Sequence, residues 1–316
     1  MMEAIPTPDL TLGPLLLHWP GEAWRDFHYR IADEAPVDTV TLGEVVCPKR
    51  WPFNRPYLEA VIERLRRAGK RVVIATPALV GSDHDAGLVR DLAAHGLPVE
   101  VNDMAALGLL QRGGTKDEVA GAEVAGPGIN SYNEATLRHL GGQGIRRVVP
   151  PPELPPASVR HLAGLSARDP EMPSLELQAF GRWPLAISAR CYHARAYGRD
   201  KATCQYACAD DPDGLPVDTL DDQPFLAVNG VQTLSHAYAC LAGELPALTV
   251  AGVQGFRLLP QDVDMVAVAQ VFRELLDGRT ETGAALDRVE ALCGDVPLAN
   301  GYQHDAPGAH LDSAPA

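Results

Sequence analysis

Long apolar segments and a basic leader are both absent from the sequence. No apolar run approaches the ~18 residues that a helix needs to cross a bilayer. Residues 1–10 include Glu3 and Asp9 and lack the basic stretch that opens a secretory signal. These absences predict a soluble, cytoplasmic protein without a transmembrane segment. In such a reducing compartment, cysteines are more often thiols or metal ligands than disulfides.

Positive charge is also scarce. The chain of 316 residues has 27 Lys and Arg against 41 Asp and Glu, which gives a formal charge of −14. Nonspecific binding to nucleic acid or to an anionic membrane requires clustered basic residues. The composition therefore predicts no nucleic-acid partner. The hydrophobic content of 46% is ordinary for a globular protein and permits a large core.

Several catalytic and nucleotide-binding motifs are missing. Gly126–Asn130 reads Gly-Pro-Gly-Ile-Asn, but it lacks the Lys-Ser/Thr of a P-loop and the third glycine of a Rossmann turn. The sequence contains no H-E-x-x-H and no G-x-S-x-G. These absences argue against a nucleotide site, a zinc protease and a serine hydrolase.

Short apolar runs alternate with helical patterns along the chain. The clearest helix is predicted over Pro56–Gly69, where Leu58, Val61, Ile62 and Leu65 follow helical spacing. This alternation predicts an α/β fold, and about eight units without a dinucleotide motif favour a closed (β/α)8 TIM-barrel-like fold. Eight runs suit buried strands and a ninth is a further candidate: Leu10–Leu17, Asp38–Leu42, Val72–Ala75, Val99–Val101, Glu123–Ala125, Arg147–Val149, Leu175–Ala179, Phe225–Val228 and Leu248–Val253.

The chain is expected to form one barrel-like domain over residues 1–316. The regular alternation runs to about residue 180. Residues 181–223 then form a long, irregular, cysteine-bearing excursion after the seventh strand. An insertion of that length in a compact domain is usually functional. The Pro- and Ala-rich tail over residues 306–316 is expected to be frayed.

Three of the six cysteines lie close together, as Cys191-x12-Cys204-x3-Cys208. Several thiolates together suit zinc or an iron–sulfur cluster. If residues 201–208 form a helical turn, Cys204 and Cys208 share one face of it. Cys47 directly follows the second strand, and the C-terminal ends of barrel strands meet at one rim. Cys47 is therefore the best fourth ligand.

The choice of metal and the other two cysteines leave alternatives open. A structural zinc site with four thiolates would usually show two closely spaced cysteine pairs, and here there is one, which favours an iron–sulfur cluster. Unrelated buried thiols are the alternative, because cysteine often behaves as a small hydrophobe. We favour that interpretation for Cys240 and Cys293, which are expected in the core.

Polar residues follow several predicted strands. Such positions in barrels are often functional, which makes these residues candidates for catalysis or substrate contact. The alternative is loop capping, because Asn and Asp favour turns. The candidates are Glu44, Asn102, Asn130 and Asn229.

Three segments of the sequence resemble the collagenase-like peptidase family U32. They are Thr41–Arg50 (TLGEVVCPKR), Gly126–Asn133 (GPGINSYN) and Phe180–Cys208 (FGRWPLAISARCYHARAYGRDKATCQYAC). Similar segments at 229–234, 254–260 and 300–308 extend the resemblance over roughly residues 8–308. Within the family, the resemblance is to a branch that serves ubiquinone biosynthesis. The last segment adds Tyr302 and His304 as site candidates.

The resemblance implies a cofactor, partners and an activity. The cofactor would be a [4Fe-4S] cluster, and the chain would form a heterodimer with a homologous UbiU-like protein and act with a UbiT-like lipid carrier. Together they would catalyse oxygen-independent hydroxylation of a quinone precursor, with the chain as the iron–sulfur subunit of the enzyme. Alternatives are a collagenase-like peptidase, an RNA-base hydroxylation protein, and a scaffold that uses the cluster only as a staple. The implied cluster ligands are Cys47, Cys191, Cys204 and Cys208.

Overall fold

Eight parallel strands close into a barrel in the computed structural model, which describes residues 7–113 and 121–312. Each strand pairs in parallel with the next, and β11 closes the ring by pairing with both β1 and β7. The expected (β/α)8 TIM-barrel-like fold is confirmed. The strands are β1 (Asp9–Leu12), β2 (Thr39–Gly43), β3 (Arg71–Ala75), β4 (Val99–Val101), β5 (Ala122–Ala125), β6 (Arg147–Val148), β7 (Ser174–Ile187) and β11 (Gly255–Leu258).

The eighth barrel strand is not the one predicted. The run Phe225–Val228 lies in β9, outside the barrel, and the run Leu248–Val253 falls mostly within the helix α9 (Leu245–Ala251). The strand that completes the barrel is β11. Its sequence Gly-Phe-Arg-Leu does not read as a buried strand because Arg257 stands in it, yet all four residues are buried.

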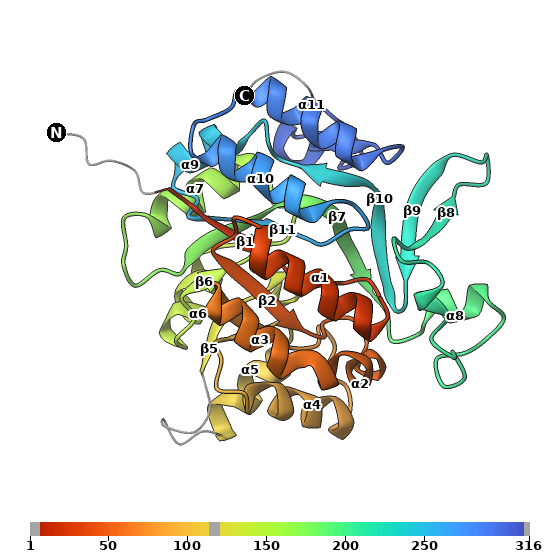
Figure 1. Ribbon diagram of the computed structural model, residues 1–316. Coiled ribbons are helices and arrows are strands. Elements are labelled where there is room, and N and C mark those ends of the chain that lie inside the picture. The colour runs from red at the N-terminus through yellow and green to blue at the C-terminus, as the bar shows by residue number, and fades with distance from the viewer. Residues whose placement is uncertain (1–6, 114–120, 313–316) are drawn as a thin grey trace.

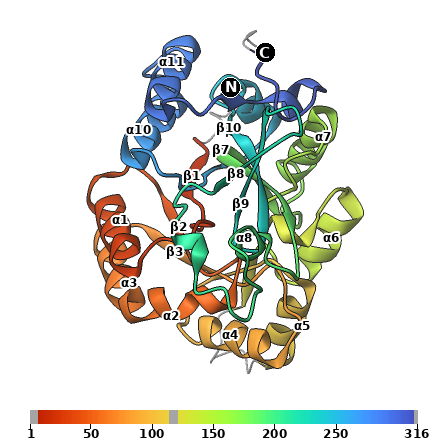
Figure 2. The ribbon, with the colours of Figure 1, turned by 90° about the vertical axis from the view of Figure 1, so that its right-hand side faces the viewer.

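Helices surround the barrel on its outer face, as Figure 2 shows. The apolar stripe predicted over 58–65 lies on α3, and its side chains are buried. Gly69 follows the helix in the left-handed region (φ 77°). The helices of the outer layer are α1 (Gly21–Glu34), α2 (Trp51–Asn54), α3 (Leu58–Arg67), α4 (Asp83–Ala93), α5 (Met104–Gly113), α6 (Glu134–Gly142), α7 (Pro156–Ser166), α9, α10 (Met265–Leu276) and α11 (Thr282–Cys293).

Between β7 and β11 the chain leaves the barrel and builds an antiparallel sheet. β7 continues past the barrel and pairs with β10 (Gln232–Cys240), which pairs with β9 (Pro224–Asn229), and β9 with β8 (Leu215–Asp218). The short strand β12 (Leu298–Ala299) joins β10 in parallel. Figure 1 shows β8 and β9 projecting to one side of the barrel. The predicted excursion over 181–223 therefore starts inside a strand and ends in a hairpin.

The irregular part of this insertion is residues 188–214, which we call the cysteine segment. It contains the short helix α8 (Tyr192–Ala196) and the turn η4 (Ala207–Ala209). Residues 201–208 do not form the helical turn that would place Cys204 and Cys208 on one face. Gln205 (φ 48°) and Tyr206 (φ 56°) adopt left-handed conformations, which a right-handed helix cannot include.

The end of the chain is attached to the barrel as far as Asp312. Asn300 and Gly301 donate backbone hydrogen bonds to the His310 carbonyl, and the Asp312 N–H donates to the side chain of Asn300 (2.7 Å). The tail is therefore not frayed over 306–312, and residues 313–316 lie outside the described part. No helix within the described ranges is long and apolar enough to cross a membrane.

Candidate functional site

Four cysteines line one small cavity, although Cys47 is distant in sequence from the other three. Cys47 follows β2 and precedes the turn η1 (Pro48–Arg50), whereas Cys191, Cys204 and Cys208 come from the cysteine segment. They meet because the loop after β2 and the insertion after β7 lie at the same end of the barrel. Cys204 is half-buried, and the other three are buried.

Glu44 holds the loop that carries Cys47. Its Oε1 accepts hydrogen bonds from the backbone N–H groups of Val46 and Cys47, both at 2.9 Å. Burial raises the pKa of Glu44, while Arg50 and the two N–H groups act in the opposite direction. Glu44 thus lies within the fold and orders the backbone beside the cavity, rather than facing a ligand.

Asn229 anchors the cysteine segment to the barrel. Its Nδ2 donates to the carbonyls of Cys208 (3.0 Å) and Asp211 (2.9 Å), and its Oδ1 accepts from Arg50 Nη2 (2.7 Å) and the His18 N–H (3.1 Å). Asn229 is fully buried at the end of β9, which is not a barrel strand. Its hydrogen-bonding capacity is used within the fold, so it positions the Cys208 backbone instead of contacting substrate.

Three cations surround the four thiols. Lys49, Arg50 and Lys201 line the same cavity, and Lys49 Nζ lies 3.7 Å from Cys204 Sγ. Burial raises the pKa of the Cys208 thiol, and Arg50 opposes that rise. Buried Arg50 leaves its Nε without a hydrogen-bond partner. The lining of this cavity is therefore positively charged although the chain as a whole is acidic, and Arg50 Nε is a hydrogen-bond donor without a partner beside the thiols.

The chemistry of this donor set fits an anionic iron–sulfur cluster, because four thiols are accompanied by three cations. Cations and N–H donors near the sulfurs are the usual protein contribution to such a site.

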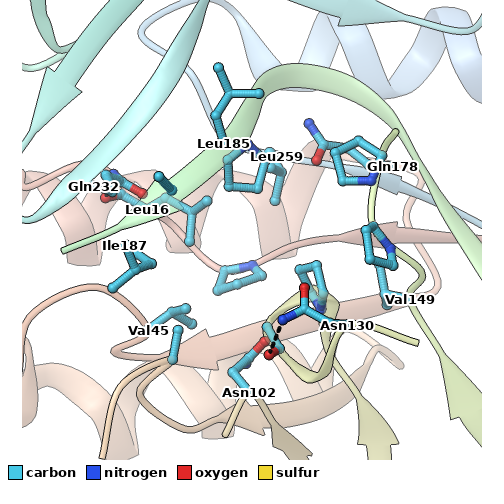
Figure 3. A pocket seen from close by; sticks show the side chains of 18 of the residues that line it. Leu16, Val45, Asn102, Asn130, Val149, Gln178, Leu185, Ile187, Gln232 and Leu259 are labelled. Carbon is cyan, nitrogen blue, oxygen red and sulfur yellow. Dashed lines mark hydrogen bonds between the residues drawn. The ribbon is translucent and has the colours of Figure 1, made fainter. Parts of the chain in front are cut away.

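A second cavity, of about 390 Å³, opens at the barrel mouth. Residues from the C-terminal ends of the barrel strands contribute to it, which is where barrel proteins bind their substrates. Figure 3 shows aliphatic side chains around most of the space. We call it the mouth pocket, and its aliphatic walls include Leu16, Val45, Val149, Leu185, Ile187 and Leu259.

Buried ion pairs form the floor of the mouth pocket. Arg257 donates to Glu100 Oε2 through Nη2 (2.6 Å) and to Glu176 Oε1 through Nε (2.5 Å). Arg147 reaches Glu176 Oε2 at 3.1 Å. Although burial raises the pKa of Glu176, the two guanidiniums outweigh burial and hold that pKa below its ordinary value. The charges of the floor therefore neutralise one another.

Two of the predicted polar candidates line the mouth pocket. Asn102 donates to Glu100 Oε1 (3.1 Å) and to the Thr76 carbonyl (3.3 Å). Asn130, in the left-handed region (φ 57°), lies on the loop after β5. Both are labelled at the lower side of the pocket in Figure 3.

His304 and Tyr302 lie in the turn η5 (Gly301–His304) and line neither cavity. His304 Nε2 contacts Glu244 Oε1 at 2.7 Å, and the Tyr302 ring packs near Trp183. The structure thus gives His304 an attachment role at the end of the chain. Cys240 and Cys293 are buried away from both cavities, as expected.

Sequence reasoning missed the charged residues that shape both cavities. Arg50 follows Cys47 by three positions, so proximity to a proposed ligand could have suggested it. Glu100 and Arg257 are 157 positions apart, and no local pattern links them. An arginine within the short apolar run of β11 was the one available signal, because a buried charge requires a partner.

One buried apolar cluster connects the two cavities. Leu16, Val45 and Leu259 line the mouth pocket and belong to the same buried apolar cluster as Cys47 and Cys191. Side chains of the mouth pocket therefore pack in the same apolar cluster as two of the thiols.

The fold and site define a parallel eight-stranded barrel protein with a pocket at its mouth and a four-thiol cavity beside it. Residues 24–305 match the family model described as Peptidase family U32, and the chain belongs to that family.

Solved structures resemble the chain at low sequence identity. Dihydropteroate synthase from Xanthomonas albilineans shares 14% identity over 92% of this chain and 95% of that chain (TM-score 0.40). A tryptophan synthase complex from Pyrococcus furiosus shares 13% over 91% and 99% (TM-score 0.40). A putative racemase from Roseobacter denitrificans shares 11% over 54% of this chain and 48% of that chain (TM-score 0.38), so the chain spans about half the racemase's length.

Proposed function

We propose that the chain is the iron–sulfur subunit of an oxygen-independent hydroxylation system for ubiquinone precursors, in the UbiV-like branch of the family. The observation that carries the proposal is the meeting of Cys47, Cys191, Cys204 and Cys208 at one cation-lined cavity beside an apolar pocket. The four thiols would hold a [4Fe-4S] cluster, which supplies one-electron transfer when bound.

The residues around the thiols have distinct roles in this proposal. Glu44 and Asn229 fix the two loops that carry the ligands. Lys49, Arg50 and Lys201 balance the negative charge of the thiolates. The buried position of Arg50 makes its contribution strong, because little water screens it.

The mouth pocket would hold the quinone precursor. Its aliphatic walls suit an apolar ring, and Asn102 and Asn130 are the polar candidates that could orient it. The apolar cluster that includes Leu16, Val45, Cys47 and Cys191 would connect the substrate pocket with the iron–sulfur site. The hydroxylase would act as a heterodimer with a homologous UbiU-like protein and receive its substrate with a UbiT-like lipid carrier.

Anaerobic purification followed by iron and sulfide analysis and EPR tests the cofactor. The protein is expected to carry one [4Fe-4S] cluster, and Cys47→Ser or Cys204→Ser to lose most of it. Cys240→Ser is the matched control, because Cys240 is buried but lies outside the cavity. Full cluster content in either ligand variant would show that the ligand assignment is incorrect.

The pathway is tested in cells grown without oxygen. Deletion of the gene is expected to abolish anaerobic ubiquinone synthesis, and the wild-type chain but not Cys47→Ser should restore it. Restoration by Cys47→Ser would contradict the proposed role, and protease activity of the cluster-free protein would favour a peptidase.

A further inference from the structure

Gln232 is the side chain of the mouth pocket whose hydrogen bonding is incomplete. It opens β10, it is 1% exposed, and its Oε1 has no hydrogen-bond partner. Among the described residues that line this pocket, no other buried side-chain nitrogen or oxygen lacks a partner. A buried acceptor without a donor is costly, so such a group calls for a partner from outside the chain.

The orientation of the Gln232 amide is set by its other end. Nε2 donates to the Leu16 carbonyl at 2.6 Å. A flipped amide would place two oxygens against each other at that distance, so Oε1 is the free atom. Gln232 is also paired through its backbone with Asn229 and Ile187 on the neighbouring strands. The free acceptor is therefore held in place before a ligand arrives.

The remaining polar groups of the pocket do not demand a charged ligand. Arg257 and Glu100 neutralise each other, and the carboxylate of Glu153, which lies exposed in the pocket lining, accepts a hydrogen bond from the Tyr132 hydroxyl. The Nε2 of Gln178 donates to the carbonyls of Gly181 (3.1 Å) and Arg182 (3.0 Å). Figure 3 shows Gln178 at the end of the pocket opposite Gln232. The chemistry left for a ligand is an apolar body with one hydrogen-bond donor near Gln232.

We propose that the mouth pocket selects a neutral, ring-sized ligand with a hydroxyl group, and that Gln232 Oε1 accepts the hydrogen bond of that hydroxyl. A hydroxyl brings one donor, whereas the second N–H of a primary amine would be left unpaired against the aliphatic wall. The proposal rests on the mouth pocket being the ligand site of the proposed function, but it does not require a cluster or turnover.

The same hydrogen-bond network places the hydroxyl end of the ligand toward the cysteine cavity. The Leu16 carbonyl that receives Gln232 Nε2 also receives Arg50 Nη1 (3.0 Å). Arg50 then reaches Asn229, which holds the Cys208 carbonyl. Gln232 is thus a positioning residue that ties the bound hydroxyl to the groups around the thiols.

The test measures binding of para-propylphenol and para-propyltoluene to the full chain by NMR titration. These probes differ in a hydroxyl replaced by a methyl group. The ratio of the affinity for the phenol to the affinity for the toluene should be about tenfold higher in wild-type protein than in Gln232→Met, because a buried acceptor rejects a ligand without a donor. Gln232→Glu, protonated when buried, should retain the wild-type preference.

Gln261→Met is the matched control. Gln261 is also buried with an unpartnered Oε1, but it does not line the pocket. The preference for the phenol should be unchanged in this variant. An unchanged preference in Gln232→Met, an equal loss in Gln261→Met, or failure of both probes to bind the wild-type chain would overturn the proposal. If anaerobically purified protein holds no iron but still prefers the phenol, the proposed function is overturned and the ligand proposal stands.

Discussion

The barrel and the cysteine segment are held together by different forces. Barrel strands are joined by continuous ladders and buried under helices such as α3, whose apolar stripe packs on the strands. The cysteine segment, residues 188–214, has one five-residue helix and depends on polar anchors, of which Asn229 is the most connected. A few side chains outside the segment therefore determine where three of the four cavity thiols lie.

The two cavities show the same difference in their charges. The mouth pocket has a floor in which Arg257 and Arg147 are matched by Glu100 and Glu176. The cysteine cavity is lined by Lys49, Arg50 and Lys201, and no carboxylate is among the described residues of its lining. A neutralised pocket suits a neutral ligand, whereas an excess of positive charge suits an anionic one.

The largest effect is expected from breaking the barrel floor. Arg257→Met leaves Glu100 and Glu176 buried without their cation and should lower the free energy of unfolding by about 3–5 kcal/mol. Denaturant titration followed by circular dichroism measures it. Arg138→Met, which removes only exposed ion pairs, should lower the free energy of unfolding far less than Arg257→Met does. Equal losses would show that burial of the floor does not matter.

A smaller and more local effect is expected from the anchor of the cysteine segment. Asn229→Ala removes the donors to Cys208 and Asp211 and should cost about 2–3 kcal/mol, because buried groups lose their partners. Hydrogen exchange should rise in residues 199–214 and stay unchanged in β2 and β3. Asn130→Gly, which retains the left-handed backbone, should change neither the free energy of unfolding nor the hydrogen exchange of residues 199–214. An equal rise in hydrogen exchange in residues 199–214 and in the barrel strands of Asn229→Ala would contradict the separation of the two regions.

The third effect depends on pH and concerns the barrel's outer layer. Burial lowers the pKa of His28 in α1 to about 4. Because the unfolded histidine titrates near 6.5, the folded state binds fewer protons between these values, so stability present above about pH 6.5 is lost as pH falls. His28→Leu should reduce this loss by about 1.4 kcal/mol per pH unit.

Unfolding measured between pH 7 and pH 5 tests this prediction. The exposed His84→Leu serves as control and should keep the wild-type dependence on pH. Burial also lowers the pKa of His18 to about 4, and His18 lies beside Phe53 and Tyr206. The stability of His28→Leu should therefore still depend on pH in part, because His18 is unchanged in that variant. An identical pH profile in wild type and His28→Leu would refute the role of His28.

The barrel could be predicted where hydrophobic periodicity was undisturbed. Seven of the barrel strands fall on predicted runs, and the helix over 58–67 lies within its predicted range. The eighth strand could not be found, because Arg257 interrupts the apolar pattern and its partners lie in β4 and β7. A helical turn over 201–208 does not form, because the backbone of Gln205 and Tyr206 is left-handed, and no residue pattern in the sequence indicates this conformation.

The site candidates divide in the same way. Cys47 and the three cysteines of the insertion could be grouped from spacing and from the rule that strand ends share a rim, and they do line one cavity. Asn229 and Glu44 lie at strand ends as expected, but both side chains form hydrogen bonds within the fold. Whether a polar residue faces a ligand or the backbone depends on neighbours that are distant in sequence.

The sequence by itself determined the alternation of strands and helices and the supply of thiols, because periodicity and residue type are local properties. Only the tertiary structure decided which residues share a cavity. Arg50 meets Asn229 across 179 positions, and Gln232 meets Leu16 across 216. These pairings arise because closing the barrel brings the loop after β1, the loop after β2 and the start of β10 to one end of the molecule.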